Sequence, residues 1–107
     1  MATFRSTTVT NTGTNVSISP VDLKAINIVN RHSAVIYVRF YNQTVATFQD
    51  TPVFTLPVAA SGGVVNLTKN GFTHKSFPNG LTIRVVTDAT DNGNTAAATL
   101  PIIELEY

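Results

Sequence analysis

The chain has 107 residues, the length of one compact domain. The sequence contains seven lysines and arginines and six aspartates and glutamates, which give a formal net charge of +1. This charge argues against nucleic acid or an anionic membrane as the partner. Cysteine is absent, which excludes disulfides, thiolate nucleophiles and cysteine-ligated metal sites. Charged residues make up 12% of the chain, about half the usual share, whereas 17 Thr, 13 Val and 10 Asn indicate strands and turns.

Apolar residues alternate with a period of two along most of the chain, which predicts strands rather than helices. The predicted strands are 4–9, 16–18, 25–29, 34–41, 53–58, 64–67, 81–87 and 100–107. Pro57 lies inside one of them, and a proline cannot donate to a strand ladder, so this strand is expected either to lie at a sheet edge or to end near Pro57. We therefore expect an all-β fold, a single β-sandwich (jelly-roll or Ig-like) of about 7–8 short antiparallel strands.

Residues 1–19 differ from the rest because they contain a single charge, Arg5, and few apolar residues. They are predicted to be an N-terminal arm laid on a neighbouring molecule or edge strands of the chain's own sheet, beside a β-sandwich domain at 20–107. In the arm hypothesis Phe4 and Val9 contact the partner. The N-terminus lacks the apolar stretch of a signal peptide, and no segment is long enough to cross a membrane.

Strand 34–41 has one apolar face and one unusual face, where tyrosine and arginine replace the small polar residues of a solvated sheet. Tyr and Arg are enriched at protein–protein contacts because each combines a large area with polar groups. Two interpretations remain open: a solvated face with cross-strand pairs, or an interface between subunits, which the low charge content favours. The proposed interface consists of Tyr37, Arg39, Tyr41 and Arg84, with Phe4 and Val9 from the N-terminal segment.

No residues with the spacing of a catalytic or metal site are found. His32 and His74 lie in polar loops, and neither has a second histidine or a triad partner at a useful spacing. Loop 88–94 contains Asp88 and Asp91 but not the spacing or the closing glutamate of a calcium loop. It is interpreted as an Asx-rich turn, with a weak cation site as the alternative. We expect no enzyme activity, no cofactor and no metal.

The order of several turn and strand segments resembles small all-β virion structural proteins of tailed bacteriophages. The resemblance covers roughly residues 35–107 and is carried by Tyr41-Asn42, the stretch 50–58, Gly62-Gly63-Val64-Val65, Phe77-Pro78-Asn79-Gly80-Leu81 and the stretch 87–91. It implies a structural protein that acts by packing rather than by catalysis. A head decoration (cement) protein is the best fit within this group. Such a protein is synthesised in the host cytoplasm and binds the major capsid protein on the capsid surface, often as a trimer.

Two other functions remain open. The first is a tail or baseplate component, present in few copies. The second, from a different class, is a carbohydrate- or receptor-binding β-sandwich with its site at Tyr37, Tyr41 and loop 88–95. The absence of Trp counts against stacking on a sugar ring. On the decoration hypothesis, removal of residues 2–15 abolishes particle binding and leaves the domain folded.

Overall fold

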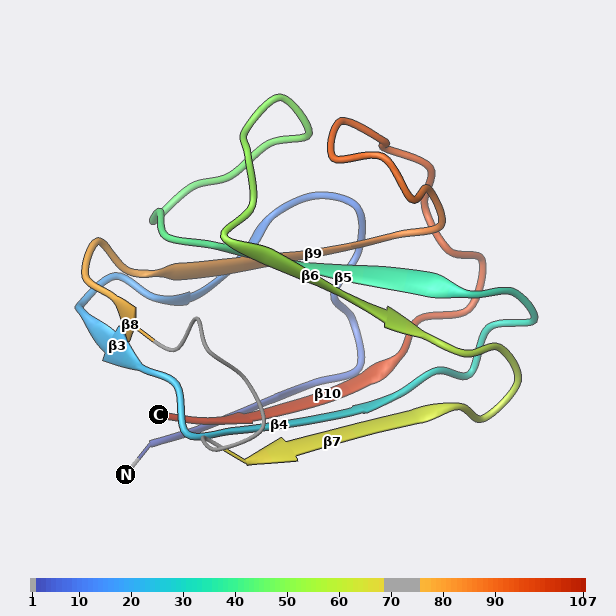
Figure 1. The fold of residues 1–107 in the computed structure, drawn as a ribbon, viewed down its shortest axis with the longest axis horizontal. Helices are drawn as coiled ribbons and strands as arrows, with labels where there is room; N and C mark the ends of the chain where they lie inside the picture. Colours follow the sequence, from blue (N-terminus) through green and yellow to red (C-terminus); the bar gives the residue numbers. More distant parts are fainter. Residues whose placement is uncertain (1, 69–75) are drawn as a thin grey trace.

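The protein is described from a computed structural model, which defines residues 2–68 and 76–107 (Figure 1). This part of the chain consists of strands, turns and loops, without a helix. The strands are β1 (Thr3–Ser6), β2 (Thr14–Ser17), β3 (Val21–Asp22), β4 (Ala25–Val29), β5 (Ile36–Tyr41), β6 (Phe54–Val58), β7 (Val64–Thr68), β8 (Ser76–Phe77), β9 (Leu81–Val86) and β10 (Ile102–Glu106).

The strands form three antiparallel sheets. Sheet A has the order β1-β10-β4-β7, sheet B has the order β2-β9-β5-β6, and β3 pairs with β8 in a two-stranded ladder. The expected all-β, antiparallel class is confirmed, and every predicted strand overlaps an observed one. The expected count of 7–8 strands is too low, because β3 and β8 are two residues long and too short to show alternation in the sequence.

The strand pairs are nested. β1 pairs with β10, β2 with β9, β3 with β8, β4 with β7, and β5 with β6. The chain therefore doubles back once, between β5 and β6, and each later strand runs beside an earlier one. Two further pairings, β10 with β4 and β9 with β5, join these ribbons into the four-stranded sheets.

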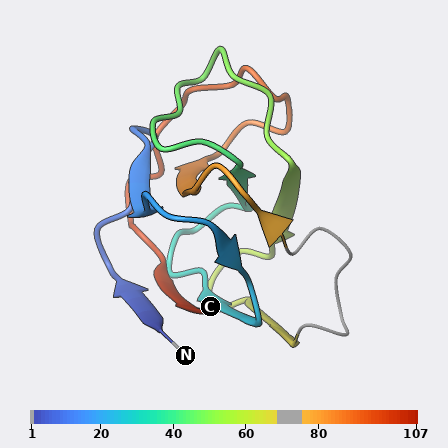
Figure 2. The same cartoon turned by 90° about the vertical axis from the view of Figure 1, so that its left-hand side faces the viewer.

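The two four-stranded sheets lie one above the other, with β9, β5 and β6 above β10, β4 and β7 in Figure 1. Their inward residues alternate along each strand, as in Ile26 and Ile28 of β4 or Val38 and Phe40 of β5, and are almost fully buried. The rings of Phe40 and Phe54 stack with centroids 4.5 Å apart. Figure 2 shows both termini at the sheet A side of the molecule.

The described N-terminal segment, residues 2–19, contributes two strands to the sheets of its own chain. β1 pairs with β10 over four residues and β2 pairs with β9, so both are edge strands. Between them Val9 is fully buried in the core, and the half-buried Phe4 packs against it. Of the two predicted alternatives, the structure contains edge strands rather than a projecting arm. A deletion of residues 2–15 removes β1 and the buried Val9, so we expect it to destabilise the domain.

The turn 77–80 returns the chain into β9. Gly80 has a φ of 106°, and its amide lies 3.2 Å from the carbonyl of Phe77. A Cβ atom at this position would lie 2.7 Å from the carbonyl oxygen of Ser17. The turn therefore requires glycine both for its backbone conformation and for its close approach to β2.

Candidate functional site

The outer face of sheet B holds four of the six residues that the sequence assigned to an interface: Tyr37, Arg39, Tyr41 and Arg84. Arg39 of β5 stands directly opposite Arg84 of β9, and Tyr41 follows on the same face. All three side chains are fully buried within the chain. They are covered by the loops 42–53 and 87–101, which rise above sheet B in Figure 1, and by the segment 10–13.

Arg84 holds this cover in place through hydrogen bonds to three parts of the chain. Its Nε donates to the carbonyl of Asn11 (2.8 Å) and its Nη1 donates to the hydroxyl of Tyr41 (2.8 Å). Its Nη2 donates to the carbonyl of Gly93 (3.2 Å) and to Oδ1 of Asn94 (2.8 Å). One guanidinium thus joins the N-terminal segment, β5 and the loop after β9, using the planar fork of donors that distinguishes arginine from lysine.

Arg39 is bound less completely. Its Nη2 donates to the carbonyls of Asp88 and Thr90, whereas its Nε and Nη1 are buried without a hydrogen-bond partner in the described structure. Among the described residues neither this arginine nor Arg84 forms an ion pair with a carboxylate. Burial is the main cause that lowers the pKa of Arg39, and the nearby charge of Arg84 acts in the same direction.

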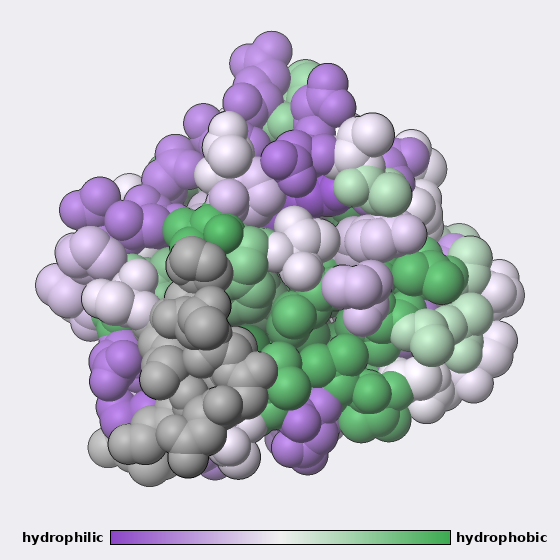
Figure 3. All heavy atoms as spheres, in the orientation of Figure 1, coloured by the Kyte–Doolittle hydropathy of each residue, from purple (hydrophilic) through white to green (hydrophobic). Residues whose placement is uncertain are grey.

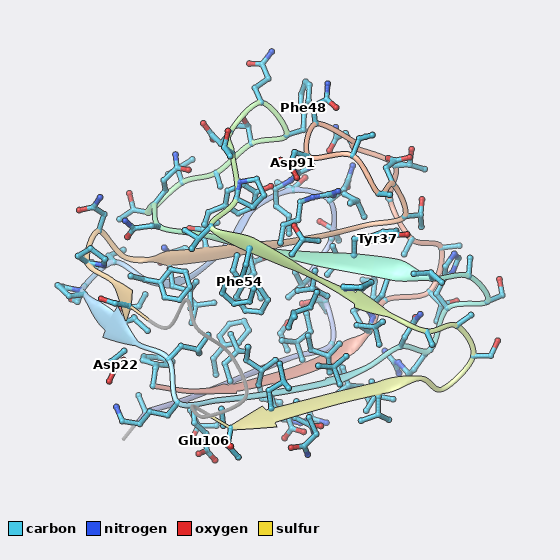
Figure 4. The ribbon with its side chains drawn as sticks, in the orientation of Figure 1. Asp22, Tyr37, Phe48, Phe54, Asp91 and Glu106 are labelled. Atoms are coloured by element: carbon cyan, nitrogen blue, oxygen red, sulfur yellow. The ribbon has the colours of Figure 1, made fainter. Side chains whose placement is uncertain are left out.

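The six residues proposed as an interface therefore do not form one exposed surface. Arg39, Tyr41, Arg84 and Val9 are buried, and Phe4 packs half-buried against the core from β1. Tyr37 keeps partial exposure at the outer face of β5 (Figure 4). The physical reason is that the loops are long enough to fold back over sheet B, and their carbonyl groups accept hydrogen bonds from Arg84 and from Nη2 of Arg39.

A pocket of about 200 Å³ lies between these loops. It is lined by Asn11, Thr12, Gly13, Ala46, Thr47, Phe48 and Asn94. Figure 4 places Phe48 on the upper loop above sheet B. The side-chain amide of Asn11 donates to the carbonyl of Asn94 (2.9 Å), so the polar wall is fixed by contacts within the chain.

Loop 88–94 is closed by a hydrogen bond within the loop and by one from the following residue, Thr95. Oδ2 of Asp88 accepts the amide of Thr95 (2.8 Å), and Gly93 donates its amide to the carbonyl of Thr90 (3.0 Å). The bond from Thr95 is the main cause that lowers the pKa of Asp88. Within the part of the chain that the structure describes, no group of three or more His, Asp or Glu side chains is placed to hold a metal ion.

Among the described residues, His32 forms no ion pair with an acidic side chain. Nδ1 of His32 accepts the amide of Thr99 (3.3 Å) in the turn region next to β4. His74 lies outside the described residues.

The outer face of sheet A carries a row of polar side chains across all four strands: Arg5, Glu104, Asn27 and Asn66 stand opposite one another. Nε of Arg5 lies 3.7 Å from Oε2 of Glu104, and the amide of Asn27 donates to Oε1 of Glu104 (2.9 Å). A hollow of about 280 Å³ lies along this row. Glu104 and Arg5 keep 42% and 58% of their side-chain surface exposed, in contrast with the arginines of sheet B.

The edge strands β6 and β7 border a strip of apolar surface. Their inward side chains pack on the core but stay partly exposed: Phe54, Leu56, Val65 and Leu67. Figure 3 shows hydrophobic atoms gathered in the region between these two strands. The sequence correctly predicted an edge position for the strand that contains Pro57. It did not predict the strip. The period-two pattern of apolar residues is the same whether their side chains are half-buried or fully buried.

Comparison of the chain with protein-family models, with curated proteins and with solved structures gave no match. The described residues contain no helix that is long and apolar enough to cross a membrane.

Proposed function

We propose that this chain is a non-enzymatic structural protein of a phage particle, with a head decoration (cement) role on the capsid surface as the favoured assignment. We further assign the fold to the jelly rolls. When the short ladder β3–β8 is set aside, the other eight strands form four nested pairs, which are distributed over two four-stranded sheets. This connectivity carries the proposal, because double-sheet jelly rolls with two Greek keys build viral capsid domains as well as lectins and cupins.

The resemblance to phage virion proteins supports the same function. The segments that carry it form parts of the fold: the stretch 50–58 leads into and forms β6, and the stretch 87–91 belongs to the loop that covers sheet B. The partners proposed are the major capsid protein and further copies of the chain, as a trimer or another homo-oligomer. The outer face of sheet A presents exposed polar side chains, Arg5 and Glu104 among them, and such a surface suits contact with another protein.

The copy number per particle tests this function. Quantitative mass spectrometry of purified virions measures the ratio of this chain to the major capsid protein. Several hundred copies, at a simple ratio to the capsid subunit, support the decoration role. A dozen copies or fewer assign the chain to the tail or baseplate, and complete absence from virions overturns the proposal.

A carbohydrate-binding module is the second candidate, favoured by the pocket of about 200 Å³ between the loops. The site is displaced from the one expected from the sequence, because Tyr41 is buried beneath the loops, whereas Asn94 lies at the pocket. Phe48, with 40% of its surface exposed, is the aromatic side chain available at this pocket for contact with a sugar ring. Glycan-array binding that the Phe48→Ala variant loses supports this candidate, and silence of the array rejects it.

A further inference from the structure

The four edge strands differ in the features that prevent edge-to-edge pairing. β1 is short and carries the charge of Arg5, β2 has a register irregularity between Asn15 and Ser17, and β6 contains Pro57. Charges, bulges and prolines are the features that protect natural sheet edges from a second strand. β7 (Val64–Thr68) has none of them, and it pairs with β4 in an unbroken register of five residues.

The direction of the backbone groups of β7 follows from its pairing with β4. The amide of Asn30 donates to the carbonyl of Gly63 (2.8 Å), which marks this pair as a hydrogen-bonded one. Bonded and non-bonded pairs alternate in an antiparallel ladder, so Val65 and Leu67 also bond to β4. The residues between them direct their N–H and C=O groups toward the edge of sheet A: Val64, Asn66 and Thr68.

The sequence of β7 is self-complementary around its central residue. In an antiparallel pair of two β7 strands centred on Asn66, each Val64 stands opposite a Thr68, and each Val65 stands opposite a Leu67. The strand is uncharged, so a two-fold axis brings no like charges together. The residues that face each other in this register include the three whose backbone groups point outward, which gives about six new main-chain hydrogen bonds.

The apolar strip between β6 and β7 lies on the same side of the molecule as this edge. Antiparallel edge pairing requires a two-fold axis perpendicular to sheet A, which places both copies of sheet B on the same side of the joined sheet. The two strips therefore face each other. The half-buried side chains of Leu56, Val65 and Leu67 lose further exposure when a second copy approaches.

We propose that β7 pairs antiparallel with β7 of a second copy of this chain, about a two-fold axis at Asn66. The four-stranded sheets A of the two copies then form one continuous eight-stranded sheet, and the apolar strips meet beneath it. This contact joins copies in pairs, in contrast with the trimer implied by the family resemblance. It does not depend on the virion role, so its failure leaves the copy-number experiment unaffected.

Cysteine substitution tests the register, because the chain has no other thiol. The full-length variant Asn66→Cys places two thiols across the two-fold axis, where facing Cα atoms about 5.5 Å apart fall within the range of a disulfide. Thr68→Cys, two residues along the same exposed side, places its thiols about 14 Å apart along the strands. Under mild oxidation we expect Asn66→Cys to form covalent dimers at least about tenfold faster than Thr68→Cys. Equal rates for the two variants overturn the proposal.

Sedimentation velocity over a concentration series gives a second measurement without cross-linking. The unmodified protein is expected to change from dimer to monomer on dilution, and Asn66→Lys, which sets two charges opposite each other, is expected to stay monomeric. Thr3→Lys on β1, the opposite edge of sheet A, is the matched control and retains the dimer. A monomer at every concentration, or a dimer that Asn66→Lys leaves intact, contradicts the proposal.

Discussion

Two regions of the molecule have a solvent exposure that their residue types do not indicate: the outer face of sheet B and the β6–β7 side. They deviate from expectation in opposite directions. The first carries tyrosines and arginines, yet Arg39, Tyr41 and Arg84 are sealed beneath loops of the same chain. The second carries valine, leucine and phenylalanine, yet these side chains remain partly exposed. Exposure in this protein is therefore decided by where the loops fold and where each sheet ends, rather than by the polarity of the strand residues.

The largest effect is expected for the arginine that fixes the cover of sheet B. Arg84→Met leaves four hydrogen-bond acceptors without their donor, in Asn11, Tyr41, Gly93 and Asn94. The loss of these bonds is expected to reduce the free energy of unfolding by about 3 kcal/mol or more. Arg39→Met removes a buried charge with two unpartnered nitrogens but also leaves the carbonyls of Asp88 and Thr90 without their donor, so a smaller loss of about 1–2 kcal/mol is expected. Urea denaturation of both variants measures the difference. Equal losses would show that the cover does not depend on Arg84 in particular.

A matched pair of core substitutions compares the two lateral sides of the molecule. Val9 lies between β1 and β2 and is fully buried. Val9→Ala is therefore expected to reduce the free energy of unfolding by about 2 kcal/mol. Val65→Ala, on the β6–β7 side, is expected to cost about 1 kcal/mol because Val65 is half-buried. Denaturation in dilute solution, where the proposed dimer is dissociated, gives both values. A larger loss for Val65→Ala would mean that the β6–β7 side is closed in the monomer.

The cover of sheet B is also expected to loosen in acid. The hydrogen bond from Thr95 holds the pKa of Asp88 below its ordinary value, and a bond from Thr47 does the same for Asp50 in the neighbouring loop. Both pKa values are depressed in the folded protein. The two carboxylates therefore stabilise the fold above the unfolded pKa of about 4, and this stabilisation is lost as the pH falls through the folded pKa values. Thermal unfolding between pH 7 and pH 2 measures the loss. Asp88→Asn should reduce this acid dependence, and an unchanged profile would contradict the role of the Thr95 bond.

The smallest effect is expected on the outer face of sheet A. Glu104→Gln removes the exposed ion pair with Arg5 and keeps an oxygen for the amide of Asn27, so the expected loss is about 0.5 kcal/mol or less. The same denaturation assay measures it, with Arg84→Met as the reference for a buried contact. A loss comparable to that of Arg84→Met would remove the distinction between the two outer faces.

Local alternation in the sequence predicted most of the fold. It located the eight longer strands, and Pro57 correctly marked an edge strand. It did not predict β3 and β8, which are held by pairing with each other across more than fifty residues of chain. The nested connectivity also depends on pairings between remote segments, such as β1 with β10, and these leave no local signal.

The site was predicted less well because burial on the outer face of a sheet depends on loop conformation. The alternation correctly placed Arg39 and Arg84 on the face away from the core, but it contained no information on the loops above them. A cue was present in the low charge of the loops 42–53 and 87–101, in which Asp50, Asp88 and Asp91 are the charged residues. Similarly, nothing in Val65 or Leu67 indicated that their strand ends a sheet.

Residue-resolved amide exchange over a dilution series tests the contrast between the sealed face and the open edge most directly. We predict that the amides of Val85 and Thr87, which bond to Thr10 and Thr95 near the cover, exchange slowly at every concentration. The amides of Asn66 and Thr68 should exchange slowly in concentrated protein and become fast on dilution, as the β7 pair separates. Slow exchange of Asn66 at the lowest concentration, together with fast exchange of Val85 and Thr87, would contradict the account.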